Sequence, residues 1–306
     1  MPGISIVTPT FNRAPLLERV WASLRKQTFA NFEWIVVDDG STDNTADTLK
    51  ALDDTRIKYV YQKNGGVSAA RNTGERHITG EFVVFLDSDD ELFDEQTLTA
   101  MESELRAAGP GVGAVAFTVK VTGDANVTSL VPKPKMLAHY AEIVCDQGAR
   151  GEFIFLFRRE AVAVRPWPDT PCAESLKLWG IAKKYPFLFV NRHGRIYHTS
   201  VGDNLTQPSN TVRLAPLIAR GLEALIAEHR AVWIEHCPEM YGRHLCNLAL
   251  NQVLANQDLA SAKTLLEAWR HHGSKLRIAA LTAGLMLGPS LRQKLFLAAA
   301  RRKRTH

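Results

Sequence analysis

The amino-acid sequence predicts an α/β protein in which a mostly parallel sheet is flanked by helices, followed by a C-terminal region that is helical. Short apolar segments alternate with amphipathic segments at the start of the chain. Strands that are apolar on both faces are typical of parallel sheets covered by helices. From Thr211 onward, apolar residues recur almost throughout at helical spacing. A composition of 45% hydrophobic and 23% charged residues indicates a chain that folds rather than a disordered one.

The predicted elements of the first part follow one another in regular order. The opening strand is ISIV, residues 4–7, and the helix at residues 14–27 has Leu17, Val20 and Leu24 on one face. Hydroxyl and carboxylate side chains just before residue 45 are typical of a helix start. Strands are further expected at residues 32–37, 57–61 and 82–86, and helices at residues 45–52, 67–76 and 95–107.

Beyond residue 110 the pattern changes. Turn-rich strands are expected up to residue 135, and the part that follows, to residue 206, is mixed. In this mixed part the segments FIFLF, FLFVN and RIYHT are expected to be strands, and residues 174–184 a helix.

Polar residues follow several of the predicted strands. In α/β sheets of this kind, ligands bind at the carboxyl ends of the strands. This rule places residues 8–12, 38–43 and 87–90 along one edge of the sheet. The last of these segments is DSDD, whose three carboxylates repel one another within a few residues. They indicate either a divalent cation that bridges to a diphosphate or a solvated acidic turn.

The other loops at this edge are weaker signals when taken singly. TPTFNR has a proline that fixes φ and an aromatic ring at the strand tip, which suits either a nucleobase platform or a loop with a core phenylalanine. NGGVSAARNTG is a glycine-rich entry into a helix, where free N–H groups favour an anion. VVDDGSTDNT ends a strand with two carboxylates. Capping of the following helix needs only one residue, so it does not explain both carboxylates.

Four segments together resemble the family 2 glycosyltransferases of the GT-A fold in order and spacing. They are SIVTPTFNR, FEWIVVDDGSTDNT, NGGVSAARNTG and EFVVFLDSDDEL. The resemblance implies an inverting transferase that uses a nucleotide-activated sugar, most often a UDP-sugar, with Mn²⁺ or Mg²⁺. It also implies that Pro9 and Phe11 hold the base, where the family more often has Tyr at the second position. Asp39 corresponds to the residue that hydrogen-bonds uracil, and Arg71 lies near the base and ribose.

The same resemblance assigns the acidic strand end. Asp87-Ser88-Asp89 corresponds to the DXD motif of the family, in which Asp89 is the metal ligand and Asp87 is directed toward the ribose. RIYHTS resembles a later family segment whose histidine, here His198, approaches the metal or the diphosphate. A histidine with a purely structural place in the strand is the alternative.

The general base is the least certain part of the pattern. The segment from residue 155 to residue 185 resembles the acceptor side of the family, where a Glu-Asp pair begins a helix and the Asp acts as base. Here the pair is Glu174-Ser175, so the expected Asp is missing. Glu174 is the predicted base and Asp169 a second choice. Alternatively, Glu174 only complements the helix dipole, or catalysis is lost.

These expectations divide the chain into a catalytic domain, residues 1–206, and a helical region, residues 207–306. Within the first, residues 1–110 are expected to bind the nucleotide sugar and residues 111–206 to serve the acceptor side. The acceptor would be a glycan or lipid-linked saccharide, as in bacterial-type surface polysaccharide synthesis. A non-catalytic nucleotide-sugar-binding or scaffold protein of the same fold is the alternative. A nucleotidyltransferase is disfavoured, because TPTFNR is not the Gly-rich basic loop that such an enzyme carries after its first strand.

The net charge of +5 arises at the end of the chain, because nine basic residues and no acidic one follow Glu267. Such a tail suits peripheral contact with an anionic membrane, or it is a solvated helix end. Nucleic acid is not expected as a partner, because no aromatic and basic reading surface accompanies the charge. The longest uncharged apolar stretch, residues 278–291, is too short to span a bilayer. A cytoplasmic location, on or near the membrane's inner face, is therefore expected.

Overall fold

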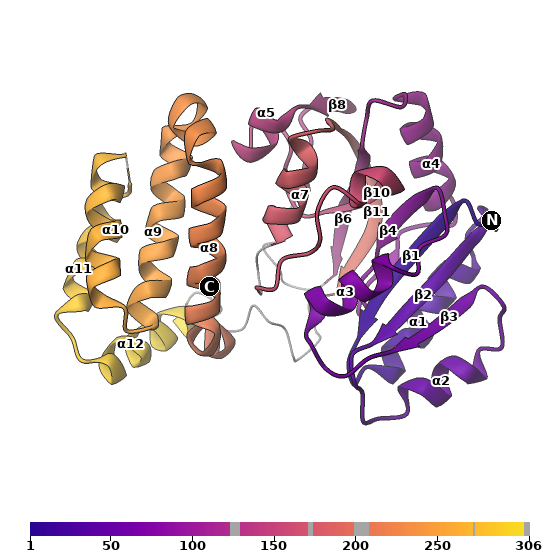
Figure 1. Cartoon of the computed structure of the whole chain (residues 1–306), viewed down its shortest axis with the longest axis horizontal. Helices are drawn as coiled ribbons and strands as arrows, with labels where there is room; N and C mark the ends of the chain where they lie inside the picture. Colours follow the sequence, from indigo (N-terminus) through magenta and orange to yellow (C-terminus); the bar gives the residue numbers. More distant parts are fainter. Residues whose placement is uncertain (123–128, 171–173, 199–207, 272, 303–306) are drawn as a thin grey trace. The chain divides into compact units, whose positions relative to one another are not determined.

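The computed structural model describes the chain except for residues 123–128, 171–173, 199–207, 272 and 303–306 (Figure 1). The chain forms two compact units. The first consists of Met1–Asp169 and Lys177–Val201, and the second of Thr170–Leu176 and Gly202–His306.

The first unit is built on one mixed sheet, in the order β3-β2-β1-β4-β10-β6-β11-β5, with β8 also pairing with β11. The four strands β3, β2, β1 and β4 are parallel, whereas β10 runs antiparallel to both β4 and β6. The strands are β1 (Ile4–Thr10), β2 (Phe32–Asp38), β3 (Ile57–Tyr61), β4 (Phe82–Phe85), β5 (Glu91–Leu92), β6 (Ala114–Thr122), β8 (Lys135–Ala138), β10 (Phe153–Arg158) and β11 (Phe187–His198). A small separate sheet pairs β7 (Ser129–Leu130) with β9 (Arg150–Gly151).

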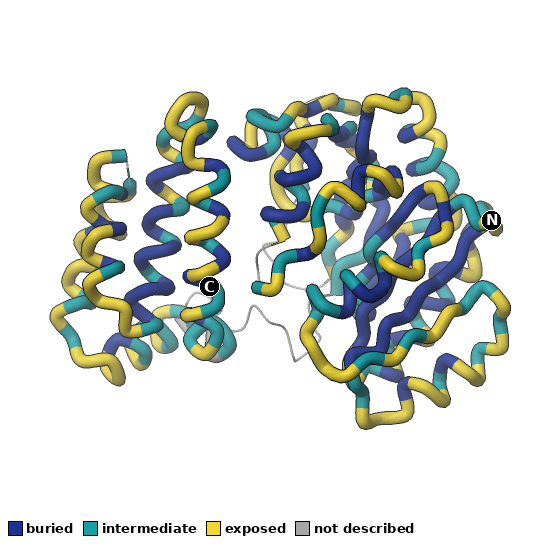
Figure 2. Tube along the Cα trace, viewed as in Figure 1, coloured by how far each residue is buried: buried dark blue, intermediate teal, exposed yellow. Residues whose placement is uncertain are grey.

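Helices cover both faces of the sheet. One face packs against α1 (Ala14–Arg25), α2 (Thr45–Ala51) and α4 (Thr97–Ala107) in a single apolar cluster. The other face packs against α3 (Val67–Glu75), α5 (Tyr140–Val144), α6 (Arg159–Val162) and α7 (Glu174–Ala182). Figure 2 shows the central strands buried along their length. The predicted α/β architecture is therefore confirmed, with parallel pairing concentrated in the N-terminal half of the sheet.

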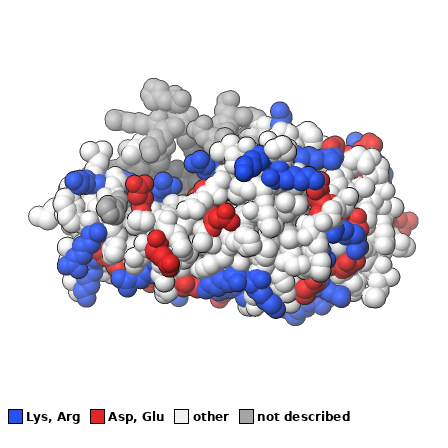
Figure 3. Space-filling model, turned by 90° about the horizontal axis from the view of Figure 1, so that it is seen from above, with Lys and Arg blue, Asp and Glu red and all other residues white. Residues whose placement is uncertain are grey.

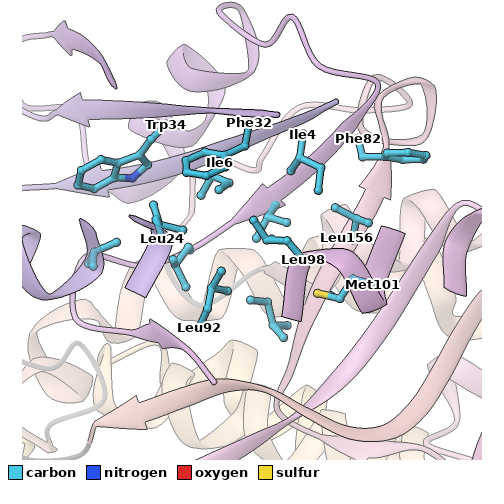
Figure 4. Packing of buried hydrophobic residues seen from close by; sticks show 14 of the residues in the cluster. Ile4, Ile6, Leu24, Phe32, Trp34, Phe82, Leu92, Leu98, Met101 and Leu156 are labelled. Carbon is cyan, nitrogen blue, oxygen red and sulfur yellow. The ribbon is translucent and has the colours of Figure 1, made fainter. Parts of the chain in front are cut away.

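The apolar periodicity of α1 explains how the first helix layer forms. Leu24 lies in the same cluster as Ile6 and Trp34 of the sheet (Figure 4). The Trp34 ring stacks on Trp21 of α1 at 5.5 Å, and its Nε1 donates to Thr8 Oγ1 at 2.9 Å. A buried indole therefore keeps its hydrogen bond while it joins the helix to the sheet.

The second unit is helical. It contains α8 (Pro208–His236), α9 (Pro238–Leu254), α10 (Asp258–Arg270), α11 (Lys275–Leu285) and α12 (Pro289–Arg302). Helices α8, α9 and α10 lie side by side (Figure 1), and Trp233 and Tyr241 are fully buried between the first two. None of the described helices is long and apolar enough to cross a membrane.

The predicted elements of the first hundred residues are confirmed, with ends that differ by a few residues. Two expectations needed correction. FLFVN and residues 195–198 of RIYHT form one strand, β11, whose pairing with β6 shifts register around His193, and Thr199 lies outside the described residues. The two-residue strand β5 was not foreseen, because it exists only through its pairing with β11.

Candidate functional site

The loops that follow β1 and β2 are tied together by side-chain hydrogen bonds. The Asn12 backbone N–H donates to Ser41 Oγ at 2.9 Å, and the Thr42 N–H donates to Asn12 Oδ1 at 2.7 Å. Asn12 adopts a φ of 51°, a left-handed conformation that Asn tolerates well. Asp43 accepts from the Ala14 N–H at 3.1 Å, which links the second loop to the start of α1. The loops after β1 and β2 are therefore joined by hydrogen bonds into one continuous structure at the carboxyl ends of these strands.

Asp38, the first carboxylate of the second loop, has a structural place. Its Oδ1 accepts from the Ser41 N–H and its Oδ2 from the Tyr59 hydroxyl, each at 2.8 Å. Burial and the Asp38 carboxylate raise the pKa of Tyr59 to about 12. The phenol therefore stays protonated and continues to donate.

Asp39, the second carboxylate, organises the glycine-rich loop. This buried side chain accepts from Gln62 Nε2 at 2.6 Å, from the Gly65 N–H at 2.8 Å and from the Gly66 N–H at 2.7 Å. Gly66 precedes α3 with a φ of 86°, which favours glycine. The N–H groups predicted to favour an anion thus already hold one, the Asp39 carboxylate, which was not expected from the sequence.

Arg71 lies in α3 and reaches the acidic strand end. Its guanidinium donates to Asp87 Oδ1 at 2.8 Å and stacks on the Trp167 ring at 4.6 Å. The Trp167 ring also meets Phe85 edge to face at 4.9 Å. Asn72 fixes the Trp167 backbone from both sides, because its Oδ1 accepts the Trp167 N–H at 2.7 Å and its Nδ2 donates to the carbonyl at 3.0 Å. The structure therefore brings Arg71 and Asp87 together. The sequence analysis did not identify Trp167 as a residue of this cluster.

Asp89 is paired with an arginine that the sequence analysis did not single out. Arg13 Nη1 donates to Asp89 Oδ2 at 2.8 Å and contacts Ser88 Oγ at 3.4 Å. Arg19 donates to the backbone carbonyl of Asp89 at 2.5 Å. Arg13 ends the segment TPTFNR, so its place directly after the first predicted loop was the only signal for it.

Asp90 forms the most buried ion pair of the strand end. Its Oδ2 lies 3.0 Å from Arg195 Nη1 of β11. Burial raises the pKa of Asp90 to about 7 against the pull of Arg195, and the neighbouring carboxylates add to the increase. Burial also acts to raise the pKa of Asp87, but Arg71 and Arg195 outweigh it and lower that pKa below its usual value. Asp87 is therefore a charged carboxylate at neutral pH.

His198 lies at the end of β11, beside the acidic strand end in the fold. Its Nε2 is 2.7 Å from Glu91 Oε1, and its Nδ1 is 3.1 Å from Thr122 Oγ1. Within the described part of the chain, no cluster of three or more His, Cys, Asp and Glu side chains is arranged to hold a metal ion. The carboxylates of Asp87 and Asp89 nevertheless suit Mg²⁺ or Mn²⁺, because such ions bind through one or two carboxylates together with substrate phosphates.

The remaining predicted residues lie at three places. Pro9 is a buried residue of β1, opposite Val37 of β2. Phe11 follows that strand with 45% of its surface exposed, as an aromatic platform requires. Glu174 is the exposed first residue of α7.

Lys177, one turn after Glu174, anchors α7. Its side chain is 1% exposed, and its Nζ lies 2.8 Å from Glu75 Oε1 of α3 and 2.7 Å from the Val162 carbonyl. From Lys177 onward this helix is therefore held by a buried ion pair with α3, the helix that also carries Arg71, whereas Glu174 belongs to the second compact unit.

Comparison with known proteins gives consistent results. The family model Glycosyl transferase family 2 matches residues 5–164, more than half of the chain. The GalNAc(5)-diNAcBac-PP-undecaprenol beta-1,3-glucosyltransferase of Campylobacter jejuni is 29% identical over 222 residues, which are 67% of this chain and 68% of that protein. Validoxylamine A glucosyltransferase of Streptomyces hygroscopicus is 46% identical over 93 residues, which are 29% of this chain and only 22% of that protein.

Solved structures are similar in fold. S. aureus TarS 1-349 in complex with UDP-GlcNAc superposes with a TM-score of 0.59 at 18% identity, covering 99% of this chain and 92% of that chain. The mannosyltransferase PcManGT from Pyrobaculum calidifontis, in complex with GDP-Man and Mn²⁺, gives 0.56 at 22% identity, covering 99% and 86%. At these identities the similarity concerns the fold.

Proposed function

Because the chain belongs to glycosyl transferase family 2, we propose that it is an inverting, metal-dependent glycosyltransferase that uses a UDP-sugar. The observation that carries this proposal is the convergence of four loops at one sheet edge. There Asp39 holds the glycine loop of α3, Arg71 pairs with Asp87, and Asp89 lies in the same short turn. Residues 1–206 would form the catalytic domain, with residues 1–110 on the donor side and 111–206 on the acceptor side.

The donor would lie along this edge. Phe11 and Pro9 would contact the base, and Asp39 would accept a hydrogen bond from it through Oδ2, which takes one bond from Gly66. Arg71 and Asp87 would face the ribose, with Ser88 beside them. Asp89, together with His198, would hold Mn²⁺ or Mg²⁺. A bound divalent ion would neutralise negative charge on the leaving diphosphate.

The reaction would be a single displacement. The acceptor hydroxyl oxygen bonds to the anomeric carbon while the bond from that carbon to the diphosphate oxygen breaks. The nucleoside diphosphate leaves with the electron pair, and the acceptor proton passes to a carboxylate, which we assign to Glu174. The configuration at the anomeric carbon is inverted.

The acceptor would be a saccharide, and the lipid-linked substrate named for the Campylobacter relative supports a lipid-linked one. This saccharide would be presented at the inner face of an anionic membrane. The alternative function is a nucleotide-sugar-binding or scaffold protein, because Ser175 stands where the family has its base. Such a protein would bind donors without releasing nucleoside diphosphate.

Release of nucleoside diphosphate from a panel of UDP- and GDP-sugars tests the proposal. Each donor is incubated with a membrane extract as acceptor source, with Mn²⁺, with Mg²⁺ and with EDTA. Release that depends on acceptor and divalent ion, and a product of inverted anomeric configuration by NMR, are expected. Donor-induced thermal stabilisation without any release would instead support the binding protein.

The assignment of the base is tested by Glu174→Gln. This variant should bind the donor normally but turn over about 10²–10⁴-fold more slowly, because an amide cannot take the acceptor proton. Asp169→Asn is the matched control, since it neutralises the other nearby carboxylate. Normal turnover in Glu174→Gln with a large loss in Asp169→Asn would move the base to Asp169.

A further inference from the structure

The outer side of α10 exposes an apolar stripe. Leu259 is 73% exposed, Leu266 55% and Trp269 58%, whereas Leu265 and Ala268 on the opposite side are buried against the unit. The spacing of seven and three residues places the exposed three on one helical face. In Figure 2 much of α10 is coloured as exposed. Large apolar side chains gathered in this way indicate a contact surface.

Positive charge runs beside the stripe. Lys263 lies four residues after Leu259 and three before Leu266, Arg270 directly follows Trp269, and both basic residues are exposed. Lys275 Nζ, at the start of α11, lies 5.8 Å from the centre of the Trp269 ring. An apolar face flanked by basic residues, with tryptophan among them, is typical of helices that lie in a membrane interface.

The two acidic side chains of α10 are engaged elsewhere. Asp258 forms a two-bond ion pair with Arg292 of α12, with N–O distances of 2.5 and 2.9 Å. Glu267 accepts from the Tyr241 hydroxyl at 2.5 Å and lies 3.0 Å from Arg230. The basic charge next to the stripe is therefore not compensated by its own helix.

Further apolar side chains are exposed after α10. They are Leu276 of α11, Met286 directly after that helix and Leu295 of α12, and Lys294 is exposed beside the last of these. No acidic residue follows Glu267. Of the basic residues in the tail predicted from the sequence, Arg292 is buried, and Lys303 and Arg304 lie outside the described residues.

We propose that the α10 outer face, defined by Leu259, Lys263, Leu266, Trp269 and Arg270, docks on an anionic lipid bilayer. Charge complementarity selects this occupant. A second copy of the chain would bring basic side chains against basic side chains, whereas anionic headgroups would neutralise them while the apolar side chains enter the interface. The link to a lipid-linked acceptor rests on the proposed function, but the docking surface does not.

Flotation of the full chain with vesicles tests the surface without any activity measurement. Vesicles of phosphatidylcholine mixed with phosphatidylglycerol should carry the protein, and vesicles of phosphatidylcholine alone should carry much less. Leu266→Ser combined with Trp269→Ser should reduce partitioning by at least about tenfold. Lys263→Gln and Arg270→Gln should each reduce binding to the anionic vesicles by about fivefold.

Matched controls separate docking from folding. Ile234→Ser removes an exposed apolar side chain from α8 and should leave flotation unchanged, and all variants should keep the melting temperature of the parent. Trp269 fluorescence should be quenched by brominated lipid, and Trp269→Phe should lose that part of the quenching. Donor-dependent release with a water-soluble acceptor should be unaffected, so a failure of this proposal is distinguishable from a failure of the proposed function.

Three results would overturn the proposal. The first is equal flotation of the parent and the Leu266→Ser, Trp269→Ser variant. The second is equal binding to both vesicle types. The third is light scattering that shows a dimer which the same double variant dissociates, because the face would then serve self-association.

Discussion

At the residue scale, each carboxylate of the acidic strand end is paired with one arginine. The pairs are Asp87 with Arg71, Asp89 with Arg13 and Asp90 with Arg195. Like charges this close would otherwise disfavour one another's ionised form. The Asp89 pair is the most readily exchanged, because Arg13 and Asp89 are partly exposed and Arg13 starts a helix from a loop.

The first prediction follows from this exchange. If Asp89 is the metal ligand, a divalent ion must compete with the Arg13 guanidinium. Arg13→Gln should therefore bind Mn²⁺ more tightly than the parent without donor, by severalfold, as the loss of a partly exposed ion pair of about 1 kcal/mol implies. Electron paramagnetic resonance of free Mn²⁺ during a titration measures this directly.

Arg19→Gln is the control for charge, because Arg19 donates to the Asp89 carbonyl and pairs with Glu91 at 3.5 Å instead of with the Asp89 carboxylate. An equal gain in Mn²⁺ affinity in both variants would attribute the effect to the loss of any positive charge near the site, and not to competition for the Asp89 carboxylate. Weaker Mn²⁺ binding in Arg13→Gln would contradict the competition.

The residues of the site differed in how far the sequence could predict them. The common location of Asp39, Asp87 and Asp89 was predictable because these residues come just after the ends of apolar strands, and parallel strands end at a common edge. The place of Arg195 in the site was not predictable, because its contact with Asp90 depends on the pairing of β11 with β5 and β6. The place of Trp167 was not predictable either, because nothing in the local sequence indicates that its ring contacts Arg71.

At the element scale, α3 is positioned by its close approach to the sheet. A Cβ placed on Gly74 would lie 2.3 Å from Val7 Cγ1 of β1 and 3.3 Å from Val37 Cγ2 of β2. Only glycine fits between these two strands at this distance. The same helix carries Arg71 and begins at the loop held by Asp39, so its distance from the sheet sets the geometry of the donor side.

The second prediction concerns this contact. Gly74→Ala should push α3 away from β1, which costs roughly 1–3 kcal/mol in the free energy of unfolding and weakens donor binding through Arg71. Urea unfolding and titration with UDP measure the two effects. Gly284→Ala is the control, because no atom lies within 4 Å of the added methyl group. Adding Val7→Ala to Gly74→Ala should recover part of the UDP affinity, and an unchanged affinity in Gly74→Ala would contradict the argument.

Element types were more predictable than element limits and pairings. Helix α10 follows from the helical spacing of its buried residues. Strand β2 follows from a short, mostly apolar run, and all seven of its residues are buried. The shift of register in β11 around His193 and Gly194 was not predictable, because it arises where β11 changes its pairing with β6.

At the scale of the whole molecule, charge is distributed unevenly along the chain. On the face shown in Figure 3, acidic and basic side chains are interspersed. The segment after Glu267 differs, since every Asp, Glu, Lys or Arg position in it is Lys or Arg. Composition predicted this asymmetry, but not the apolar stripe of α10, because the sequence alone does not tell which side of a helix in a bundle is covered.

The helical unit is expected to lose stability in acid, and His244 of α9 provides the test. Its ring stacks on Trp233 at 4.4 Å, and burial together with the charge of Arg243 lowers its pKa from 6.5 to about 4. The unfolded chain therefore binds more protons than the folded one between these values, so the helical unit loses stability as pH falls through this window. Between pH 7 and pH 5 the free energy of unfolding should fall by about 2 kcal/mol.

The variant His244→Phe, which keeps a ring against Trp233, should reduce this loss of stability. The variant His236→Phe, at an exposed position, should not. Urea unfolding followed by far-ultraviolet circular dichroism at both pH values gives the comparison, and equal losses in His244→Phe and the parent would show that another group senses the acid.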